Sequence, residues 1–460
     1  MIARDKRSGM ATGGASPLRP AGMLVIAFAL ASCGNVNEGP GPGGAQPPGT
    51  QFAGSPRAGT LDGAFGVRGV ETTAVGPGGN DVAYALIQQT ADHKLVAAGF
   101  SFDGAQNRFA VARYTTSGTL DLAFGTNGKV TTPIGAKDDK AHALALQSDG
   151  KLVAAGSTND GTQNRFALAR YTTAGALDGA FGTGGLVTTP IGAKDDEAFA
   201  LALQSDGKLV AAGFTNDGVQ NKFALVHYNA DGALDATGFG TGGKVTTPIG
   251  AKDDKAYALA LQPDGKLVAA GYTDDGTQKR FALVRYNADG SLDATGFGSG
   301  GIVTTAIGAK DDEAFALAIQ TDGKLVAAGY TDDGTQKRFA LARYTTAGVP
   351  DGTFGTGGIV TTAVGTTDDQ IHGLALQSDG KPVVAGYSFD GSQYLFSLAR
   401  YTTNGALDAS FGRIGGTVTT PVGSTEDEAY ALIVQTDGKL VAAGRSIVSG
   451  QSQFALARYW

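Results

Sequence analysis

The strongest constraint on the fold is a segment of 57 to 59 residues that the chain repeats seven times. A fixed period of this length indicates one duplicated supersecondary unit, and neighbouring units must bury each other's faces. The copies are marked by a Leu-Asp pair, or Pro-Asp in the sixth copy, whose aspartates are Asp62, Asp121, Asp178, Asp235, Asp293, Asp351 and Asp408. The sequence therefore predicts a single array of seven units.

Each unit contains four short runs rich in Val, Thr, Leu, Phe and Tyr, which in the second copy are residues 130–134, 141–147, 151–156 and 166–171. Clusters of Gly, Asp, Asn and Ser separate these runs, as expected of short antiparallel strands. Gly150 stands in one of these turns, at a position where a positive φ is needed. Four strands in a meander are typical of one blade of a β-propeller.

Proline indicates the order of the strands within a blade, because it cannot donate a hydrogen bond to a neighbouring strand and belongs on a sheet edge. The run Val-Thr-Thr is followed by proline in four copies, at Pro133, Pro190, Pro248 and Pro421. That run is therefore predicted to be outermost, and the chain then opens with an outermost strand (about 61–75) and closes with a third strand (454–459). We expect an all-β, seven-bladed β-propeller with four antiparallel strands per blade, whose last blade joins three carboxyl-terminal strands to one amino-terminal strand.

Alternation along the third run of each unit predicts how the blades pack. Phe166 and Leu168 point to one face of the sheet, and Ala167 and Ala169 point to the other. Large side chains of one blade then meet small ones of the next, so that sheets about 10 Å apart can pack without voids.

The pattern LDxxFGxxGxVxT, followed by DGKLVAAG and FALxRY, resembles the delta-60 repeat of bacterial surface and secreted proteins. It covers residues 59–460. This resemblance implies a propeller-like array and carries no established catalytic residues. The strand order is also similar to that of NHL-type propellers, although the repeat here is longer.

The amino-terminal segment indicates export and lipid attachment. Basic residues precede an apolar run at 21–30, which is too short to span a membrane and ends in Leu-Ala-Ser-Cys. This ending resembles the bacterial lipobox, which implies a lipid on Cys33; the alternative is a cytosolic chain with an accidental hydrophobic start. We expect a signal peptide at 1–32, a flexible Gly- and Pro-rich linker at 33–58 and the propeller at 59–460.

Composition narrows the classes of partner. Cys33 is the only cysteine, so the fold is expected to form without a disulfide. Cleavage before Cys33 would remove four basic residues and one acidic residue and change the formal net charge from −7 to −10. An acidic surface argues against nucleic acid and against charge-driven adhesion to anionic lipid. We expect a monomer held by acyl chains in the bacterial cell envelope, at the outer membrane or cell surface.

The most regular acidic feature is an aspartate at the start of each predicted innermost strand, expected to ring one mouth of the central channel. Such a ring could attract a hard cation such as Ca²⁺, which takes several oxygen ligands. Alternatively, each aspartate caps backbone N–H groups in its own turn, which the sequence favours. These residues are Asp81, Asp139, Asp196, Asp254, Asp312, Asp369 and Asp427.

A second set of acidic loops is expected at the same mouth, between the second and third strands of the blades. Polar loops on a rigid scaffold are common binding surfaces, whereas a solvated hairpin tip is the structural alternative. We predict this face as the surface for a protein or glycan partner. The acids of these loops are Asp160, Asp217, Asp275 and Asp333.

The remaining polar residues favour structural roles. The arginine of the Arg-Tyr pair could form an ion pair with the next Leu-Asp aspartate, and His227 replaces it in one copy. His142 and His372 stand where other copies have Tyr or Phe, so we interpret them as aromatic substitutes. No zinc-like spacing, Gly-x-Ser-x-Gly motif or Cys-His arrangement occurs, and we predict no catalytic residue and no metal site.

Three hypotheses of function remain. The first is a non-catalytic binding or scaffold protein, which the near-identity of the seven copies favours, because an active site needs unlike groups gathered at one spot. The second is an enzyme acting on carbohydrate or a quinone-type dehydrogenase, since propellers support both. The third is a purely structural protein of the envelope.

Overall fold

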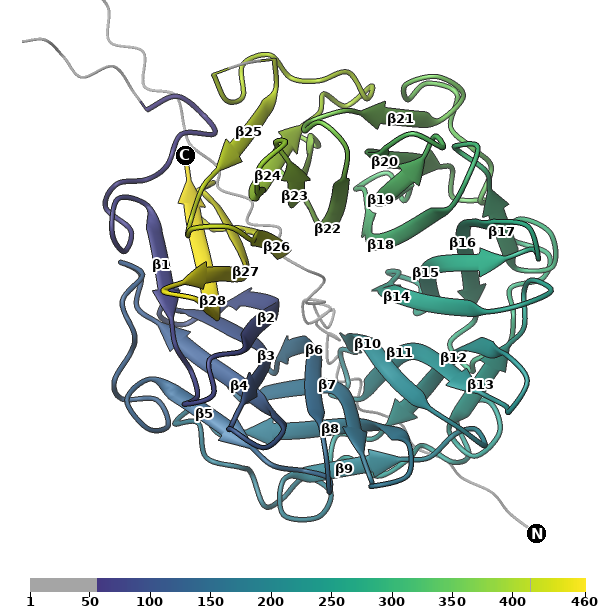
Figure 1. Ribbon diagram of the computed structural model, residues 1–460. Helices are drawn as coiled ribbons and strands as arrows, with labels where there is room; N and C mark the ends of the chain where they lie inside the picture. The colour runs from purple at the N-terminus through teal and green to yellow at the C-terminus, as the bar shows by residue number, and fades with distance from the viewer. Residues whose placement is uncertain (1–55, 414) are drawn as a thin grey trace, which may run out of the picture.

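The computed structural model describes residues 56–413 and 415–460, which form a ring of seven four-stranded antiparallel sheets around a central axis (Figure 1). No helix occurs within these residues. The predicted seven-bladed β-propeller is therefore confirmed. The predicted signal peptide, Cys33 and all but the last three residues of the predicted linker lie outside the described residues.

The strands take the predicted order from the axis outward in every blade. The innermost strands of blades 1 to 7 are β2 (Asp81–Gln88), β6 (Asp139–Leu146), β10 (Asp196–Leu203), β14 (Asp254–Leu261), β18 (Asp312–Ile319), β22 (Asp369–Leu376) and β26 (Asp427–Val434). The second strands are β3 (Leu95–Phe102), β7 (Leu152–Asn159), β11 (Leu209–Asn216), β15 (Leu267–Asp274), β19 (Leu325–Asp332), β23 (Pro382–Phe389) and β27 (Leu440–Val448).

The outer half of each blade follows the same order. The third strands are β4 (Asn107–Tyr114), β8 (Asn164–Tyr171), β12 (Asn221–Tyr228), β16 (Lys279–Tyr286), β20 (Lys337–Tyr344), β24 (Tyr394–Arg400) and β28 (Gln451–Tyr459). The outermost strands are β5 (Lys129–Thr132), β9 (Leu186–Thr189), β13 (Lys244–Thr247), β17 (Ile302–Thr305), β21 (Ile359–Thr362), β25 (Thr417–Thr420) and, in blade 7, β1 (Val70–Thr73).

The two ends of the described chain meet in blade 7. β1 pairs with β28, as the sequence predicts, and the register places Val70 opposite Ala457. β1 is shorter than the expected strand at 61–75. Leu61 adds an isolated bridge to Tyr459. Each of the four prolines lies one residue beyond the end of an outermost strand. At that position the missing N–H group of proline removes no hydrogen bond from the sheet.

Neighbouring blades bury each other's faces in the predicted manner. Phe166 and Leu168 of blade 2 pack in one cluster with Ala211 and Ala224 of blade 3, and all four are fully buried. Between blades 2 and 3, the Tyr228 hydroxyl donates a hydrogen bond to Thr189 Oγ1 at 2.9 Å. The equivalent Tyr–Thr contact joins every adjacent pair of blades around the ring.

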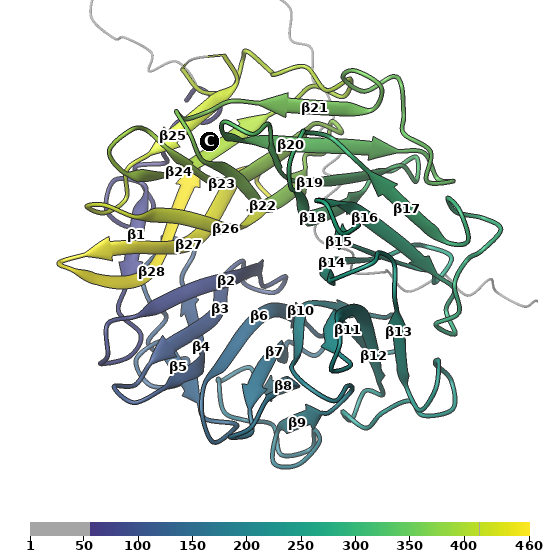
Figure 2. The same ribbon diagram turned by 45° about the vertical axis from the view of Figure 1, so that its right-hand side comes forward.

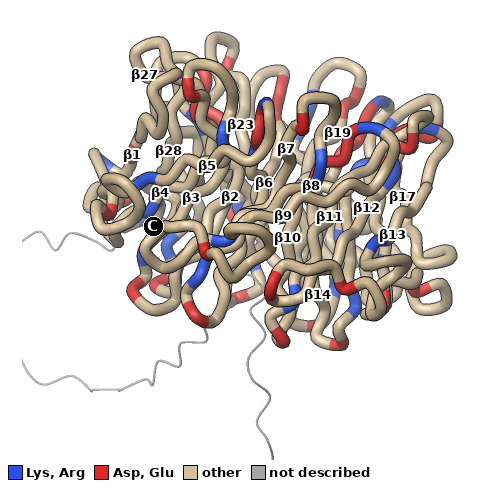
Figure 3. Tube along the Cα trace, turned by 90° about the horizontal axis from the view of Figure 1, so that it is seen from below, with Lys and Arg blue, Asp and Glu red and all other residues tan. Residues whose placement is uncertain are grey.

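The ring has two different mouths (Figure 2). We call the opening where the innermost strands begin the first mouth, which also carries the loops between second and third strands. The second mouth carries the loops after the innermost strands and the connections between third and outermost strands. Acidic residues lie in the loops at both mouths (Figure 3).

The motifs Leu-Asp-x-x-Phe-Gly and Arg-Tyr meet at one corner of each blade, at the second mouth. Arg170 Nε lies 2.8 Å from Asp178 Oδ2, Lys151 Nζ lies 3.0 Å from the same oxygen, and the Arg170 guanidinium stacks 4.6 Å from the Phe181 ring centroid. Arg170 Nη1 also donates to the Ala230 carbonyl of the next blade at 2.6 Å. The predicted ion pair is confirmed, and equivalent pairs are Arg113–Asp121, Arg285–Asp293, Arg343–Asp351, Arg400–Asp408 and Arg458–Asp62.

The exceptional corner in blade 3 generates a stability prediction. His227 Nδ1 lies 3.2 Å from Asp235 Oδ2, and burial lowers the pKa of His227, so this corner lacks a permanently charged partner besides Lys208. We expect His227→Arg to raise the free energy of unfolding by about 0.5 to 2 kcal/mol, because it restores the repeated pair and the contact to the next blade. The midpoint of guanidinium-induced unfolding measures this change.

His93→Arg is the matched control, because His93 lies in an exposed loop at the second mouth, and it should leave the midpoint unchanged. A lower midpoint for His227→Arg would contradict the structural role assigned to the repeated arginine.

Candidate functional site

The seven aspartates that begin the innermost strands lie in a ring at the first mouth, but their side chains are buried, with exposed fractions of 0 or 1%. Asp139 Oδ2 accepts a hydrogen bond from the backbone N–H of Ile134 at 2.8 Å, and its Oδ1 accepts from Gly135 N–H at 3.0 Å and from the Thr158 hydroxyl at 2.5 Å. Equivalent donors, two backbone N–H groups and one hydroxyl, bind Asp196, Asp254, Asp312 and Asp427. Ser446 supplies the hydroxyl for Asp427.

The predicted ring of aspartates is present at the first mouth, and its carboxylates are directed into their own turns. The aspartates stabilise the turn that links the outermost strand of one blade to the innermost strand of the next, which is the structural alternative favoured above. Burial raises the pKa of four of them against the opposing hydrogen bonds: Asp81, Asp254, Asp312 and Asp369. Within residues 56–413 and 415–460, no group of three or more His, Cys, Asp or Glu side chains is placed to hold a metal ion.

The second set of predicted acids does lie in loops at the first mouth, where each binds its own loop. Asp160 Oδ1 accepts from the backbone N–H of Thr162 at 2.8 Å, and its Oδ2 accepts from Arg165 Nε at 3.1 Å. Hydrogen bonds from the side chain and backbone of Thr162 are the main cause that lowers the pKa of Asp160. Comparable contacts within the loop lower the pKa of Asp217, Asp275 and Asp333.

A further acid, which sequence reasoning did not separate from its neighbour, joins adjacent blades at the first mouth. Asp138 immediately precedes Asp139, and its Oδ1 accepts the backbone N–H of Asn107 in the preceding blade at 2.9 Å. We call this contact the carboxylate latch. It recurs at Asp195, Asp253 and Asp311.

Seven aromatic or histidine side chains form a closed ring around the axis, one from each innermost strand. A β-bulge leaves each of these residues outside the strand register, for example Phe199 between Ala198 and Ala200. Centroids of neighbouring rings are 4.5 to 5.1 Å apart all the way around. The members of this axial ring are Tyr84, His142, Phe199, Tyr257, Phe315, His372 and Tyr430.

The histidines of the axial ring behave as aromatic substitutes, as predicted. Burial lowers the pKa of His142 to about 3 and that of His372 to about 4, so both are neutral at physiological pH. The sequence did place an aromatic residue at this position in most copies, but the closed ring depends on the bulge, which the alternation of residues does not reveal.

Blade 7 departs from the repeat at the first mouth. Arg445 occupies the position that carries an aromatic ring in five of the other blades. Its Nη2 lies 2.9 Å from Glu426 Oε2 and 2.9 Å from Glu428 Oε1, and the Tyr430 hydroxyl donates to Glu428. This group of unlike side chains is fully paired within itself.

Comparison with protein families supports the repeat assignment. A family model described as a domain of unknown function (DUF5122) beta-propeller matches residues 90–124, 147–181, 204–237, 262–295, 320–354, 377–411 and 435–460. Each matched segment begins in the loop after an innermost strand. The first six end within the motif that the Leu-Asp or Pro-Asp pair opens, and the seventh ends at residue 460. No curated protein sequence matches the chain. The resemblance to delta-60 repeats stays a prediction.

The solved structures that match the chain are distant in sequence. Sqt1 from Chaetomium thermophilum is 15% identical, with a TM-score of 0.46 and coverage of 82% of each chain. A protein from Lactobacillus plantarum is also 15% identical, with a TM-score of 0.46 over 78% of this chain and 94% of that one. The PQQ-bound aldose sugar dehydrogenase of Streptomyces coelicolor is 16% identical, with a TM-score of 0.37 over 69% and 94%.

The two classes of aspartate generate a prediction about acid stability. At the corners, burial opposes but does not outweigh the hydrogen bonds and charges of Lys and Arg, and all seven aspartates have a lowered pKa. Their stabilisation is present above the ordinary pKa of about 4 and is lost as the pH falls through the lowered values. The four buried turn aspartates with raised pKa values change the stability in the opposite direction. Their contribution is present below the ordinary pKa and is lost as the pH rises through their raised values.

We therefore expect the thermal midpoint to stay level or rise slightly from pH 7 to about pH 4 and to fall steeply below it. Thermal unfolding followed by circular dichroism between pH 7 and pH 2 measures this profile. In Asp293→Asn the fall at low pH should be shallower, since one corner carboxylate is removed. A midpoint that declines steadily from pH 7 to pH 5 would show that the corner aspartates do not dominate.

Proposed function

This chain belongs to the DUF5122 β-propeller family, and we propose that it is a non-catalytic binding protein of the bacterial cell envelope, anchored by a lipid on Cys33. Its first mouth is the surface offered to a protein or glycan. The observation that carries this proposal is the rigid display of polar hairpin loops there. In blades 1 to 6 each loop is held by its own aspartate, and a hydrogen bond joins it to the next blade. Loops fixed in this way bind with little loss of conformational entropy.

The proposal of a non-catalytic role rests on how the acids of the first mouth are used. The repeated aspartates accept hydrogen bonds from turns, from latches or from their own loops, and the cluster of Arg445 with Glu426 and Glu428 is paired within itself. A catalytic site instead needs acid, base or nucleophile directed at an open reaction centre.

The envelope location rests on the amino-terminal sequence, where basic residues, a short apolar run and Leu-Ala-Ser-Cys coincide. Within the part of the chain that the structure describes, there is no helix long and apolar enough to cross a membrane. Acyl chains on Cys33 would provide the attachment.

Lipid attachment predicts where the protein is found after cell fractionation. When the full chain is expressed in a bacterium, it should sediment with membranes and incorporate labelled palmitate, whereas Cys33→Ser should do neither. Ser32→Ala is the control, because it keeps a small residue before the cleavage site. Equal sedimentation of wild type and Cys33→Ser would contradict the anchor.

Binding at the first mouth predicts that immobilised Cys33→Ser protein retains a component of a detergent extract of the envelope. Since this variant contains no cysteine, one thiol can be introduced and blocked with a polyethylene glycol chain. Blocking Thr335→Cys, in an exposed loop of the first mouth, should reduce retention, whereas blocking Asp322→Cys, in an exposed loop of the same blade at the second mouth, should not. The reverse result would place binding elsewhere, and no retention at all would favour a purely structural protein.

A further inference from the structure

The carboxylate latch between blades changes its chemistry at blade 6. There the backbone N–H of Lys337 donates to the Thr367 carbonyl at 2.9 Å, so the side chain of Asp368 does not form the latch. Asp368 Oδ2 instead accepts from the Tyr394 hydroxyl at 3.2 Å, and its Oδ1 accepts from Gln370 Nε2 at 3.0 Å. The side chain of Asp368 remains 27% exposed, which makes its carboxylate reachable from solvent, unlike the buried turn aspartates.

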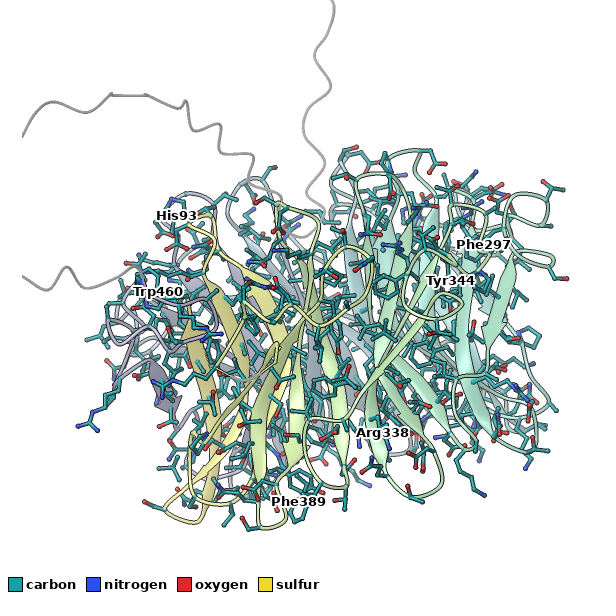
Figure 4. The ribbon with its side chains drawn as sticks, turned by 90° about the horizontal axis from the view of Figure 1, so that it is seen from above. His93, Phe297, Arg338, Tyr344, Phe389 and Trp460 are labelled. Carbon is teal, nitrogen blue, oxygen red and sulfur yellow. The ribbon has the colours of Figure 1, made fainter. Side chains whose placement is uncertain are left out.

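Aromatic side chains extend outward from the axial ring along blade 6. His372 lies 5.5 Å from Tyr387, Tyr387 lies 5.4 Å from Tyr394, and Tyr394 lies 5.1 Å from Phe389, measured between ring centroids. Phe389 and Tyr394 are half-buried, and Phe389 lies at the first mouth, with Arg338 and away from Trp460 (Figure 4). We call Tyr387, Phe389 and Tyr394 the aromatic track.

Other blades lack the outer part of the track. Blade 2 has Asn159 and Asn164 at the positions of Phe389 and Tyr394, and Asn159 Nδ2 donates to Asn164 Oδ1 at 2.9 Å. Blade 1 has Phe102 at the first of these positions and Asn107 at the second. In blade 6 the tilted pair of rings of Phe389 and Tyr394 stands where blade 2 has an amide pair, so the repeat itself does not require these rings.

A cavity of about 260 Å³ opens beside Asp368, between the loops of blades 5 and 6. Its polar lining contributes hydroxyl, amide, ammonium and carboxylate groups from Asp332, Thr335, Gln336, Lys337, Thr367 and Asp368. Blades 2 to 5 have Ala-Lys where blade 6 has Thr366-Thr367, so a hydroxyl stands here in place of a long basic side chain.

We propose that the aromatic track and the adjoining cavity form a binding site for an uncharged saccharide. A sugar ring can place its C–H face on Tyr394 and Phe389 while its hydroxyls exchange hydrogen bonds with Asp368, Gln336 and Thr367. A few polar groups beside aromatic surface provide orientation and specificity in such a site. This inference rests on the proposed binding function and assigns it a ligand class and a location.

Charge favours an uncharged sugar over the alternatives. Asp368, Glu426 and Glu428 lie near the track. The cations beside them, Arg445 and Lys337, are already paired with these carboxylates, so they offer no unpaired charge to attract an acidic polysaccharide. A basic peptide is also disfavoured, because Glu426 is already paired with Arg445 and Asp368 with the Tyr394 hydroxyl and, at 4.0 Å, Lys337. A neutral hydroxyl can donate to one group and accept from another without displacing these pairs.

The test measures binding of the Cys33→Ser protein to immobilised uncharged hexasaccharides of glucose, mannose, galactose and N-acetylglucosamine, with hexagalacturonate as the acidic probe. We expect at least one uncharged probe to bind and the acidic probe to bind at least tenfold more weakly. Phe389→Asn combined with Tyr394→Asn should weaken binding at least tenfold. This variant should fold, since blade 2 carries the same residues at those positions.

Phe102→Asn is the matched control, because it removes the equivalent ring of blade 1, where Asn107 stands in place of Tyr394. The affinity of this control should equal that of the parent. Unchanged affinity in the double variant would overturn the assigned site while leaving the binding function intact. If no saccharide binds but a Lys- and Arg-rich peptide does, the ligand class is wrong. Failure to retain any envelope component in the earlier experiment would instead contradict the binding function itself.

Discussion

Every blade of this propeller is apolar on both faces, so a blade is stable only when a neighbour covers each face. The clusters of buried residues accordingly span adjacent blades, as between blades 2 and 3, and the stability of such an array resides in its interfaces. Pairing of β1 with β28 closes the ring, which covers the face that an open array would expose. The corner arginines and the Tyr–Thr hydrogen bonds add directional contacts between the same blades.

Because the interfaces repeat, residues that occur in every copy mostly serve them. Asp139 illustrates this point, since it is buried and accepts hydrogen bonds from the turn that links blades 1 and 2 and from Thr158. Sites of individual function are then expected where the copies differ. Blades 6 and 7 differ most in chemistry at the first mouth, with Tyr394 in place of asparagine or lysine and Arg445 in place of an aromatic ring.

Much of the fold could be predicted because its determinants are local or periodic. The period showed seven units, proline indicated the outermost strand, and the alternation of Phe166 with Ala167 indicated the packing of blades. The candidate site was predicted less well. A sequence shows that Asp138 and Asp139 are both acidic, but not that one spans two blades while the other is buried in a turn. Nor does it show the bulge at Phe199, because a one-residue shift in pairing leaves no mark on the pattern of residue types.

The point at which the chain enters the propeller has a consequence for orientation. Ala58 accepts a hydrogen bond from Gly412 N–H at 2.9 Å, and Gly59 N–H donates to the carbonyl of Trp460 at 2.5 Å, both at the second mouth. The chain that precedes Ala58 therefore joins the ring at its second mouth. If Cys33 carries the proposed lipid, the second mouth faces the membrane, and the loops of blade 6 lie on the opposite side of the ring and are directed away from the membrane.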